Sequence, residues 1–249
     1  MPLKKLIESD LKFPVFVAND VNAVALGEAT FGAGKGYANS LCITLGTGVG
    51  GGIIIDGKLY VGSHQFAGEI GHMVVEKDGL KCNCGGIGCM ERYVGSNYII
   101  GYAVEAIKNG RKTKIEKLVN KDLSKITPKV IADAAKQNDK LALEIWDKIG
   151  RYIGVILGSV LNFLDPGVII IGGGVSQAGD FVLKPIRNEV KKRAYPMLTK
   201  IVKIVPAKLG DDAGCIGSSQ LVYQNIAKRK SHPAERDRIP RQDLTPLWK

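Results

Sequence analysis

Short apolar runs alternate along this chain with segments of helical periodicity. Five apolar runs predict strands, at residues 15–18, 41–45, 53–55, 168–171 and 201–205. Helical spacing predicts helices at residues 21–30, 91–108, 139–163, 180–194 and 212–226, with a further helix starting at Thr127-Pro128. Residues 111–126 form a predicted charged connector, and Tyr152 to Phe163 is apolar nearly all round and should be buried. Strands that alternate with helices in this way predict an α/β fold.

Two glycine-rich segments follow predicted strands. Gly46-Thr47-Gly48-Val49-Gly50-Gly51 fits the G-x-G-x-x-G pattern, but dinucleotide binding requires a following helix, and here a strand ending at the hairpin signal Asp56-Gly57 follows. Residues 46–52 are therefore a predicted turn between strands, which could offer backbone N–H groups and the Thr47 hydroxyl to phosphate oxygens. An ordinary glycine hairpin is the alternative. Gly172-Gly173-Gly174 directly follows the strand predicted at 168–171.

A carboxylate lies where the first predicted strand meets the first predicted helix. Asp20 and its neighbour Asn19 follow residues 15–18, and ligands of open α/β sheets bind at the carboxyl ends of strands. Asp20 could act as a general base that takes the proton from a substrate hydroxyl as its oxygen attacks phosphorus. Asp is also a favoured N-cap residue, so capping the helix is the alternative role.

The most specific chemical signal is a set of one histidine and three cysteines. Its members are His72, Cys82, Cys84 and Cys89, with the spacing His-x9-Cys-x-Cys-x4-Cys. One imidazole and three thiolates favour Zn²⁺ and would close a tetrahedron without an open position for water, which predicts a structural zinc site. The alternatives are reduced cysteines in a loop, or a disulfide, which would leave an odd cysteine. Cys42 and Cys215 are expected to be small core residues.

Acidic side chains flank this set. Glu69 lies three residues before His72, so both side chains would face the same way in a helical turn, and Glu91 lies two residues after Cys89. With one imidazole nitrogen on a metal, the other N–H could donate to a ligand hydroxyl, while the two carboxylates accept hydrogen bonds. Such groups suit a polyol such as a sugar. Alternatively, Glu69 is a solvated surface residue and Glu91 a first-turn helix acid.

Composition narrows the class of protein. With 249 residues and 45% hydrophobic content, the chain can form one large or two small domains. It has no apolar run near eighteen residues, so we expect no membrane span, no signal peptide and a cytoplasmic location. The net charge is +11, of which residues 228–249, with seven basic and three acidic residues, supply +4. The remaining +7 would attract an anionic ligand such as a nucleotide, whereas nucleic acid is not an expected partner, because no Arg or aromatic cluster lies beside the cysteines.

The order of these motifs resembles that of the ROK family of repressors and sugar kinases. The matching segments are Val-Ala-Asn19-Asp20-Val-Asn-Ala-Val-Ala-Leu-Gly-Glu28, Leu-Gly46-Thr-Gly48-Val-Gly-Gly, Gly68-Glu69-Ile-Gly-His72, Cys82-Asn-Cys84-Gly-Gly-Ile-Gly-Cys89-Met-Glu91, Ile171-Gly172-Gly173-Gly174-Val175-Ser176 and Gly210-Asp211-Asp212-Ala213-Gly214. The likeness spans residues 15 to about 226. It implies an α/β, actin-like, hexokinase-type ATPase fold (ribonuclease H-like), mainly its C-terminal lobe, with an embedded structural zinc loop.

The resemblance also implies a role for each site residue. Asp20 would be the catalytic base; Asn19, Glu69, His72 and Glu91 would hold the sugar; Gly46, Thr47, Gly48, Gly172, Gly173 and Gly174 would bind ATP; and His72, Cys82, Cys84 and Cys89 would bind Zn²⁺. The implied reaction transfers the γ-phosphoryl group of ATP to a hexose, typically to the 6-hydroxyl of glucose, with Mg²⁺ bridging the phosphates. Family members commonly form dimers or tetramers, so a homo-oligomer is expected.

The chain departs from the family pattern at one point. Family kinases begin with a strand and an Asp-x-Gly-Gly-Thr phosphate loop, which no segment here matches. We therefore expect residues 1–35 to be a remnant of the N-terminal lobe, residues 36–227 to be the C-terminal lobe with a zinc loop at 72–91, and residues 228–249 to be a basic, flexible tail. The alternatives to an active kinase are an inactive sugar-binding remnant or assembly partner, a repressor, for which no helix-turn-helix is matched, and a nucleic-acid-binding zinc protein.

Overall fold

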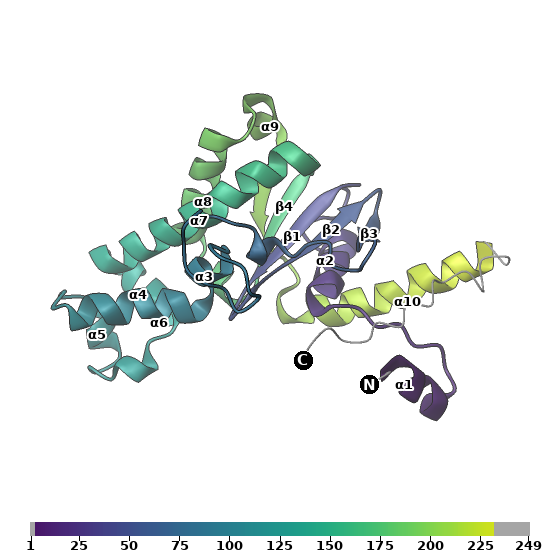
Figure 1. Cartoon of the computed structure of the whole chain (residues 1–249), viewed down its shortest axis with the longest axis horizontal. Helices are drawn as coiled ribbons and strands as arrows, with labels where there is room; N and C mark the ends of the chain where they lie inside the picture. Colours follow the sequence, from purple (N-terminus) through teal and green to yellow (C-terminus); the bar gives the residue numbers. More distant parts are fainter. Residues whose placement is uncertain (1–2, 232–249) are drawn as a thin grey trace.

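An open mixed sheet of five strands forms the centre of the molecule (Figure 1). The structure is a computed structural model, and it describes residues 3–231. The strands are β1 (Ser40–Leu45), β2 (Val49–Ile55), β3 (Lys58–Tyr60), β4 (Val168–Gly172) and β5 (Lys203–Pro206). Their spatial order is β3-β2-β1-β4-β5. β1, β4 and β5 run parallel to one another, while β2 pairs antiparallel with both β1 and β3.

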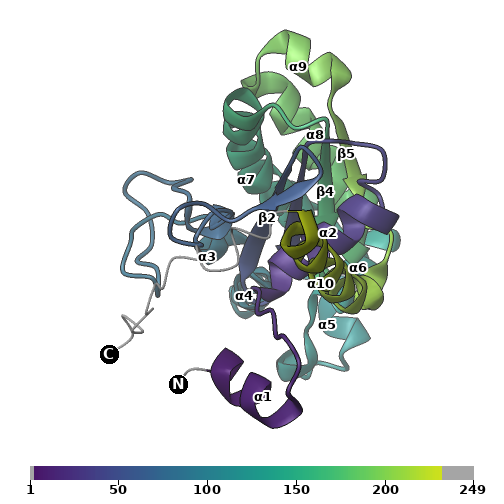
Figure 2. The ribbon, with the colours of Figure 1, turned by 90° about the vertical axis from the view of Figure 1, so that its right-hand side faces the viewer.

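Helices cover both faces of this sheet. The helices are α1 (Leu3–Leu11), α2 (Asp20–Phe31), α3 (Glu91–Val94), α4 (Ser96–Lys108), α5 (Lys114–Leu118), α6 (Pro128–Lys136), α7 (Lys140–Leu164), α8 (Asp180–Arg193), α9 (Pro196–Ile201) and α10 (Ala213–Ser231), with 3-10 turns η1 (Ile70–His72), η2 (Leu123–Lys125), η3 (Gly174–Ala178) and η4 (Gly210–Asp212). Figures 1 and 2 show α7 and α8 on one face and α2 and α10 on the other. The alternation of strand side chains explains this division, because Leu41 and Ile43 join the core with α7 and α8, whereas Cys42 packs with Ala25 of α2.

Glycines allow α2 to lie directly against its neighbours. A Cβ at Gly217 of α10 would lie 1.7 Å from the Ala23 carbonyl oxygen, and one at Gly52 would lie 2.4 Å from the Ala25 Cβ. The predicted turn at 46–52 is too long, because Val49 and the glycines at 50–52 belong to β2. In this strand the absence of side chains lets α2 pack closely against one face of the sheet. It also lets the Gly68 backbone approach Gly51, where a Cβ would lie 2.6 Å from the Gly68 carbonyl oxygen.

Three further predicted segments differ from the structure. Residues 15–18 are not a strand, and Val17 is 59% exposed. An apolar run becomes a strand only where a neighbouring strand pairs with its backbone, and within residues 3–231 none pairs with this segment. The helix predicted at 91–108 is split at Gly95, which has an extended conformation with ψ 150°. The predicted connector at 111–126 contains α5 and η2.

Two apolar residues predicted to be buried are exposed. Phe163 of α7 is 92% exposed although Leu161 is buried, because two residues along a helix point to nearly opposite sides. The same reason applies to Cys215 of α10, which is exposed while Ala213, two residues earlier, is buried. Cys42 is buried as predicted.

The chain ends follow the sequence expectations only in part. Within residues 3–231, no helix carries an apolar stretch of the length that a bilayer crossing needs. Helix α10 continues to Ser231 and so extends into the predicted tail, whose residues 232–249 lie outside the described part of the chain. The division into a lobe remnant, a C-terminal lobe and a tail stays a prediction.

Candidate functional site

The two glycine segments meet at one edge of the sheet. β1 and β4 are parallel neighbours, with Thr44 opposite Gly172, so the segments that follow them share the carboxyl edge, where α/β sheets bind ligands. Gly173 has φ 82°, and a Cβ there would lie 2.4 Å from the Leu45 carbonyl oxygen. The residues predicted to bind ATP are therefore brought together, with residues 46–48 forming a tight turn that we call the glycine turn.

A cavity of about 360 Å³ opens beside the start of β2. Its lining combines the start of α2, the start of β2 and the segment before η1: Val17, Ala18, Asn19, Val21, Asn22, Gly50, Gly51, His64, Gln65, Phe66, Ala67, Gly68 and Glu69. Gly50 pairs with Thr44, so the cavity also lies at the carboxyl edge. Two of the residues predicted to hold a sugar, Asn19 and Glu69, thus line one cavity, whereas His72 and Glu91 are not part of its lining.

The start of α2 separates the roles of Asn19 and Asp20. Asn19 is the N-cap, and its side-chain oxygen accepts hydrogen bonds from the N–H groups of Val21 (2.9 Å) and Asn22 (3.3 Å). Asp20 is the first residue of the helix and is exposed, and its Oδ1 accepts from the Val21 N–H at 2.9 Å. The alternative in which Asp20 is the N-cap is wrong, because Asn19 has the extended backbone and the hydrogen bonds of a cap.

Glu91 contacts the glycine turn directly. Its Oε2 accepts a hydrogen bond from the Val49 N–H at 2.9 Å, and a Cβ at Gly48 would lie 2.7 Å from the same oxygen. The side chain is half-buried at the start of α3. Glu91 is therefore a first-turn acid of α3, as the alternative held, but it also binds the glycine turn, and one of its oxygens is already occupied by the backbone.

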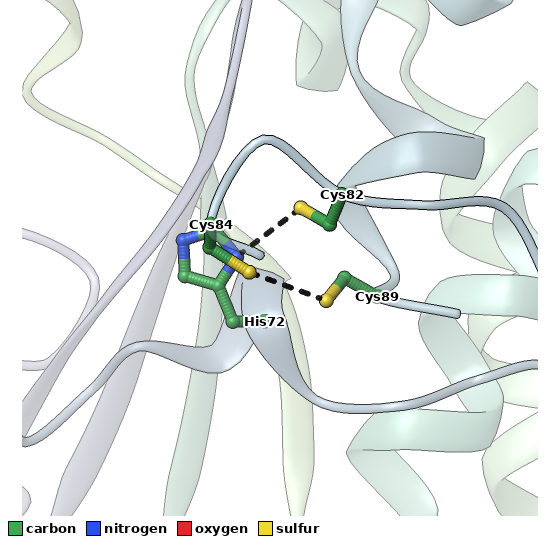
Figure 3. Close-up of side chains that lie close together, drawn as sticks. All are labelled: His72, Cys82, Cys84 and Cys89. Carbon is green, nitrogen blue, oxygen red and sulfur yellow. Dashed lines mark hydrogen bonds between the residues drawn. The ribbon is translucent and has the colours of Figure 1, made fainter. Parts of the chain in front are cut away.

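The histidine and the three cysteines predicted to bind metal converge in space (Figure 3). Their ligand atoms all lie within 4.8 Å of one another. His72 Nδ1 is 3.7 Å from Cys82 Sγ, and Cys84 Sγ is 3.7 Å from Cys89 Sγ. Around a tetrahedral zinc ion with Zn–S bonds of about 2.3 Å, two sulfurs lie about 3.8 Å apart. The donor set and its spacing therefore fit a closed four-ligand metal site.

The backbone around these ligands folds as tightly as the glycines suggested. Gly85 and Gly88 have φ values of 94° and 75°, which residues with a Cβ rarely adopt. The Gly86 N–H donates to Cys84 Sγ at 3.4 Å and lowers the pKa of this exposed thiol, while burial raises the pKa of the Cys89 thiol to about 12. A bound cation would favour the thiolate form of both.

His72 also faces the predicted sugar residues. Its Nε2 lies 3.9 Å from Glu69 Oε2, so the two side chains face one another across η1, as their spacing predicted. Since Nδ1 faces the sulfurs, Nε2 would carry the proton of a metal-bound imidazole. This N–H would point toward the Glu69 carboxylate at the cavity wall.

A buried carboxylate that no sequence pattern predicted joins two segments of the site. Glu28 of α2 is fully buried, and its two oxygens accept the backbone N–H groups of Ala33 (2.8 Å), Lys208 (2.9 Å) and Leu209 (2.7 Å). Lys208 and Leu209 follow β5, at the same carboxyl edge, and lead into η4. A motif contained Glu28, but no local pattern signalled contacts with residues so distant in sequence.

Comparison with known proteins identifies the family. The ROK family model matches residues 1–225. The chain belongs to the ROK family. It is 42% identical over 224 residues to a glucokinase of Halalkalibacterium halodurans, a match that covers 90% of this chain and 68% of that protein. It is 35% identical to a xylose repressor of Bacillus spizizenii, covering 90% of this chain and 54% of the repressor.

A solved structure confirms the fold. A ROK family glucokinase from Streptomyces griseus, in complex with glucose and AMPPNP, superposes with a TM-score of 0.79 at 38% identity, over 90% of this chain and 72% of that one. The prediction of an actin-like, hexokinase-type ATPase fold is thereby confirmed. The ROK relatives support a sugar kinase, and they include regulators as well as kinases. The roles of the individual site residues stay predictions.

Proposed function

We propose that this chain is an ATP-dependent hexose kinase that transfers the γ-phosphoryl group of ATP to the 6-hydroxyl of glucose. The observation that carries the proposal is the meeting, at one carboxyl edge, of the glycine turn, the Gly173 segment and the cavity lined by Asn19 and Glu69. The backbone N–H groups of the glycine turn and the Gly173 segment suit anionic phosphates, and the polar groups of the cavity suit a polyol. The likeness to glucokinases supports glucose as the first choice of sugar.

Asp20 is the proposed general base. It is exposed beside the cavity, adjoining its wall residues Asn19 and Val21 in the chain, and Asn19 already caps α2. Its carboxylate would take the proton of the attacking sugar hydroxyl, while the backbone of the glycine turn donates to phosphate oxygens. Mg²⁺ bound with ATP would offset the charge that develops during transfer. Holding both substrates in line would supply much of the rate.

We further propose that the four-ligand site holds a structural Zn²⁺. All four positions would be filled by His72, Cys82, Cys84 and Cys89, which leaves no place for a reacting water. The ion would order the loop that ends at Glu91 and fix the tautomer of His72. A homo-oligomer and a cytoplasmic location stay predictions.

The proposal is tested by sugar-dependent release of ADP from the metal-loaded full chain with Mg-ATP and a panel of hexoses. Asp20→Asn should abolish turnover without reducing sugar binding, because the amide keeps the shape but cannot accept the proton. The matched control is Asp180→Asn, which changes an exposed aspartate at the start of α8 and should leave turnover unchanged.

The main alternative is a sugar-binding protein without turnover. Thermal stabilisation by glucose, with no ADP released by the wild-type chain, would identify it. Stabilisation by xylose in place of glucose, again without turnover, would instead favour a sugar-responsive regulator, as the likeness to a xylose repressor suggests.

A further inference from the structure

The junction between α3 and α4 contacts the glycine turn through hydrogen bonds and close backbone packing. The Gly46 carbonyl oxygen accepts two hydrogen bonds from Ser96, one from its N–H (2.9 Å) and one from its hydroxyl (2.8 Å). A Cβ at Gly95 would lie 2.7 Å from the Thr47 carbonyl oxygen, so only glycine allows this close approach. The turn and the junction are separated by about fifty residues of chain but form one packed unit.

These contacts set the direction of a peptide group. In a trans peptide, the C=O and the N–H of the next residue point to opposite sides. Because Ser96 fixes the Gly46 carbonyl toward α4, the Thr47 N–H points away from α4. Within residues 3–231 this N–H and that of Gly48 donate no hydrogen bond, and Thr47 is exposed.

We propose that Ser96 is a positioning residue that aims the Thr47 N–H at a nucleotide phosphate. The inference rests on the proposed function, since it requires a phosphate at the glycine turn. Residues 46–48 hold one another only through the Gly46 N–H to Gly48 carbonyl bond of 2.9 Å. Contacts from outside the turn therefore add to the hold that the flanking strands β1 and β2 have on its orientation. Two donors on one carbonyl hold the peptide plane more firmly than one, and a preorganised donor binds an anion without reorientation.

Ser96 should affect the nucleotide and not the sugar. It is not part of the lining of the cavity that contains Asn19 and Glu69. Ser96→Ala removes the hydroxyl but keeps the backbone N–H on Gly46, so one of the two bonds remains. Loss of one hydrogen bond predicts about threefold to tenfold weaker nucleotide binding, and Ser96→Thr, which keeps a hydroxyl, should restore it.

The test is calorimetric titration of the metal-loaded full chain with Mg-AMPPNP, and separately with glucose. Ser159→Ala is the matched control, because Ser159 is an exposed serine whose hydroxyl bonds only to the Val155 carbonyl of its own helix. We expect Ser96→Ala to raise the Kd for Mg-AMPPNP about threefold to tenfold, with a glucose Kd and a thermal midpoint equal to those of the control.

The outcomes separate this inference from the proposed function. Equal affinity of Ser96→Ala and wild type for Mg-AMPPNP would overturn the positioning role alone. A variant that loses nucleotide and glucose binding together, with a lower thermal midpoint, would show a general structural role and also overturn it. If the wild-type chain binds no Mg-AMPPNP, the proposed kinase function fails, and this inference fails with it.

Discussion

Glu28 should be one of the costliest single side chains to remove. Its carboxylate is fully buried and accepts three backbone N–H groups, from Ala33, Lys208 and Leu209. Glu28→Ala would leave all three without an acceptor, and a buried donor left without a partner costs about 1–3 kcal/mol. Three such groups give about 3–9 kcal/mol, and water that enters the vacated space would place the effect in the lower half of this range. Since domains unfold with about 5–15 kcal/mol, much of the stability is at stake.

Glu28→Gln provides a graded test of the same reasoning. The amide oxygen can still accept the N–H groups of Lys208 and Leu209, but the NH2 group then faces the Ala33 N–H, so one bond is lost and two donors oppose each other. We expect a loss of about 1–3 kcal/mol, smaller than for Glu28→Ala. This variant also keeps the comparison usable if Glu28→Ala does not fold.

Urea unfolding followed by circular dichroism measures these free energies. The control is Glu144→Ala, which breaks an exposed ion pair with Arg111 of 2.6 Å and should cost less than about 1 kcal/mol. If the free energies of unfolding of both Glu28 variants lie within about 1 kcal/mol of that of this control, the buried carboxylate does not stabilise the fold as its hydrogen bonds indicate.

Two further predictions concern acid stability and the metal site. Burial would raise the pKa of Asp139, but hydrogen bonds from Lys114 N–H, Ala142 N–H and the Thr113 hydroxyl outweigh it and lower the pKa. The ionised carboxylate therefore stabilises the folded state above the ordinary pKa of about 3.9, and this stabilisation is lost as pH falls through the lowered pKa. Asp139→Asn should therefore flatten the fall of the thermal midpoint below about pH 4, and an unchanged profile would contradict this. Removal of the metal by a chelator should lower the thermal midpoint and make the exposed Cys84 thiol reactive, in addition to exposed Cys215. Buried Cys42, whose pKa is raised to about 12 by burial and by Glu28, should stay unreactive. Equal labelling of Cys84 before and after chelation would exclude a bound metal.

Local patterns predicted the parts of the site whose residues lie close in sequence. The four metal ligands fall within one short segment, so their spacing in the sequence was enough to predict that they converge. The strands β1 and β4 and the helix α2 were predicted because continuous apolar runs and helical spacing are local signals. The start of α2 was predicted as well, although Asn19 and Asp20 are both good caps and only the backbone conformation assigned the cap to Asn19.

The contacts that position the site could not be predicted in this way. Ser96 bonds to a carbonyl about fifty residues earlier, and Glu28 bonds to N–H groups about 180 residues later. Neither residue type is unusual in a helix, so periodicity gives no signal for them. The strand predicted at 15–18 was wrong for the same reason, since strand formation depends on a pairing partner that the local sequence does not specify.

A metal held by His72 and the three cysteines would also influence the proposed phosphate site at the glycine turn, through Glu91. Ordering one residue costs about 1–2 kcal/mol of backbone entropy, and much of residues 72–89 is exposed, so apolar burial offsets little of this cost. A four-ligand ion would supply binding energy that a loop of this composition lacks. The last ligand, Cys89, lies two residues before Glu91, whose carboxylate holds the Val49 N–H, and seven before Ser96, which holds the Gly46 carbonyl. Loss of the ion would therefore loosen both attachments of the glycine turn at once, whereas loss of Glu28 would loosen only the segment after β5.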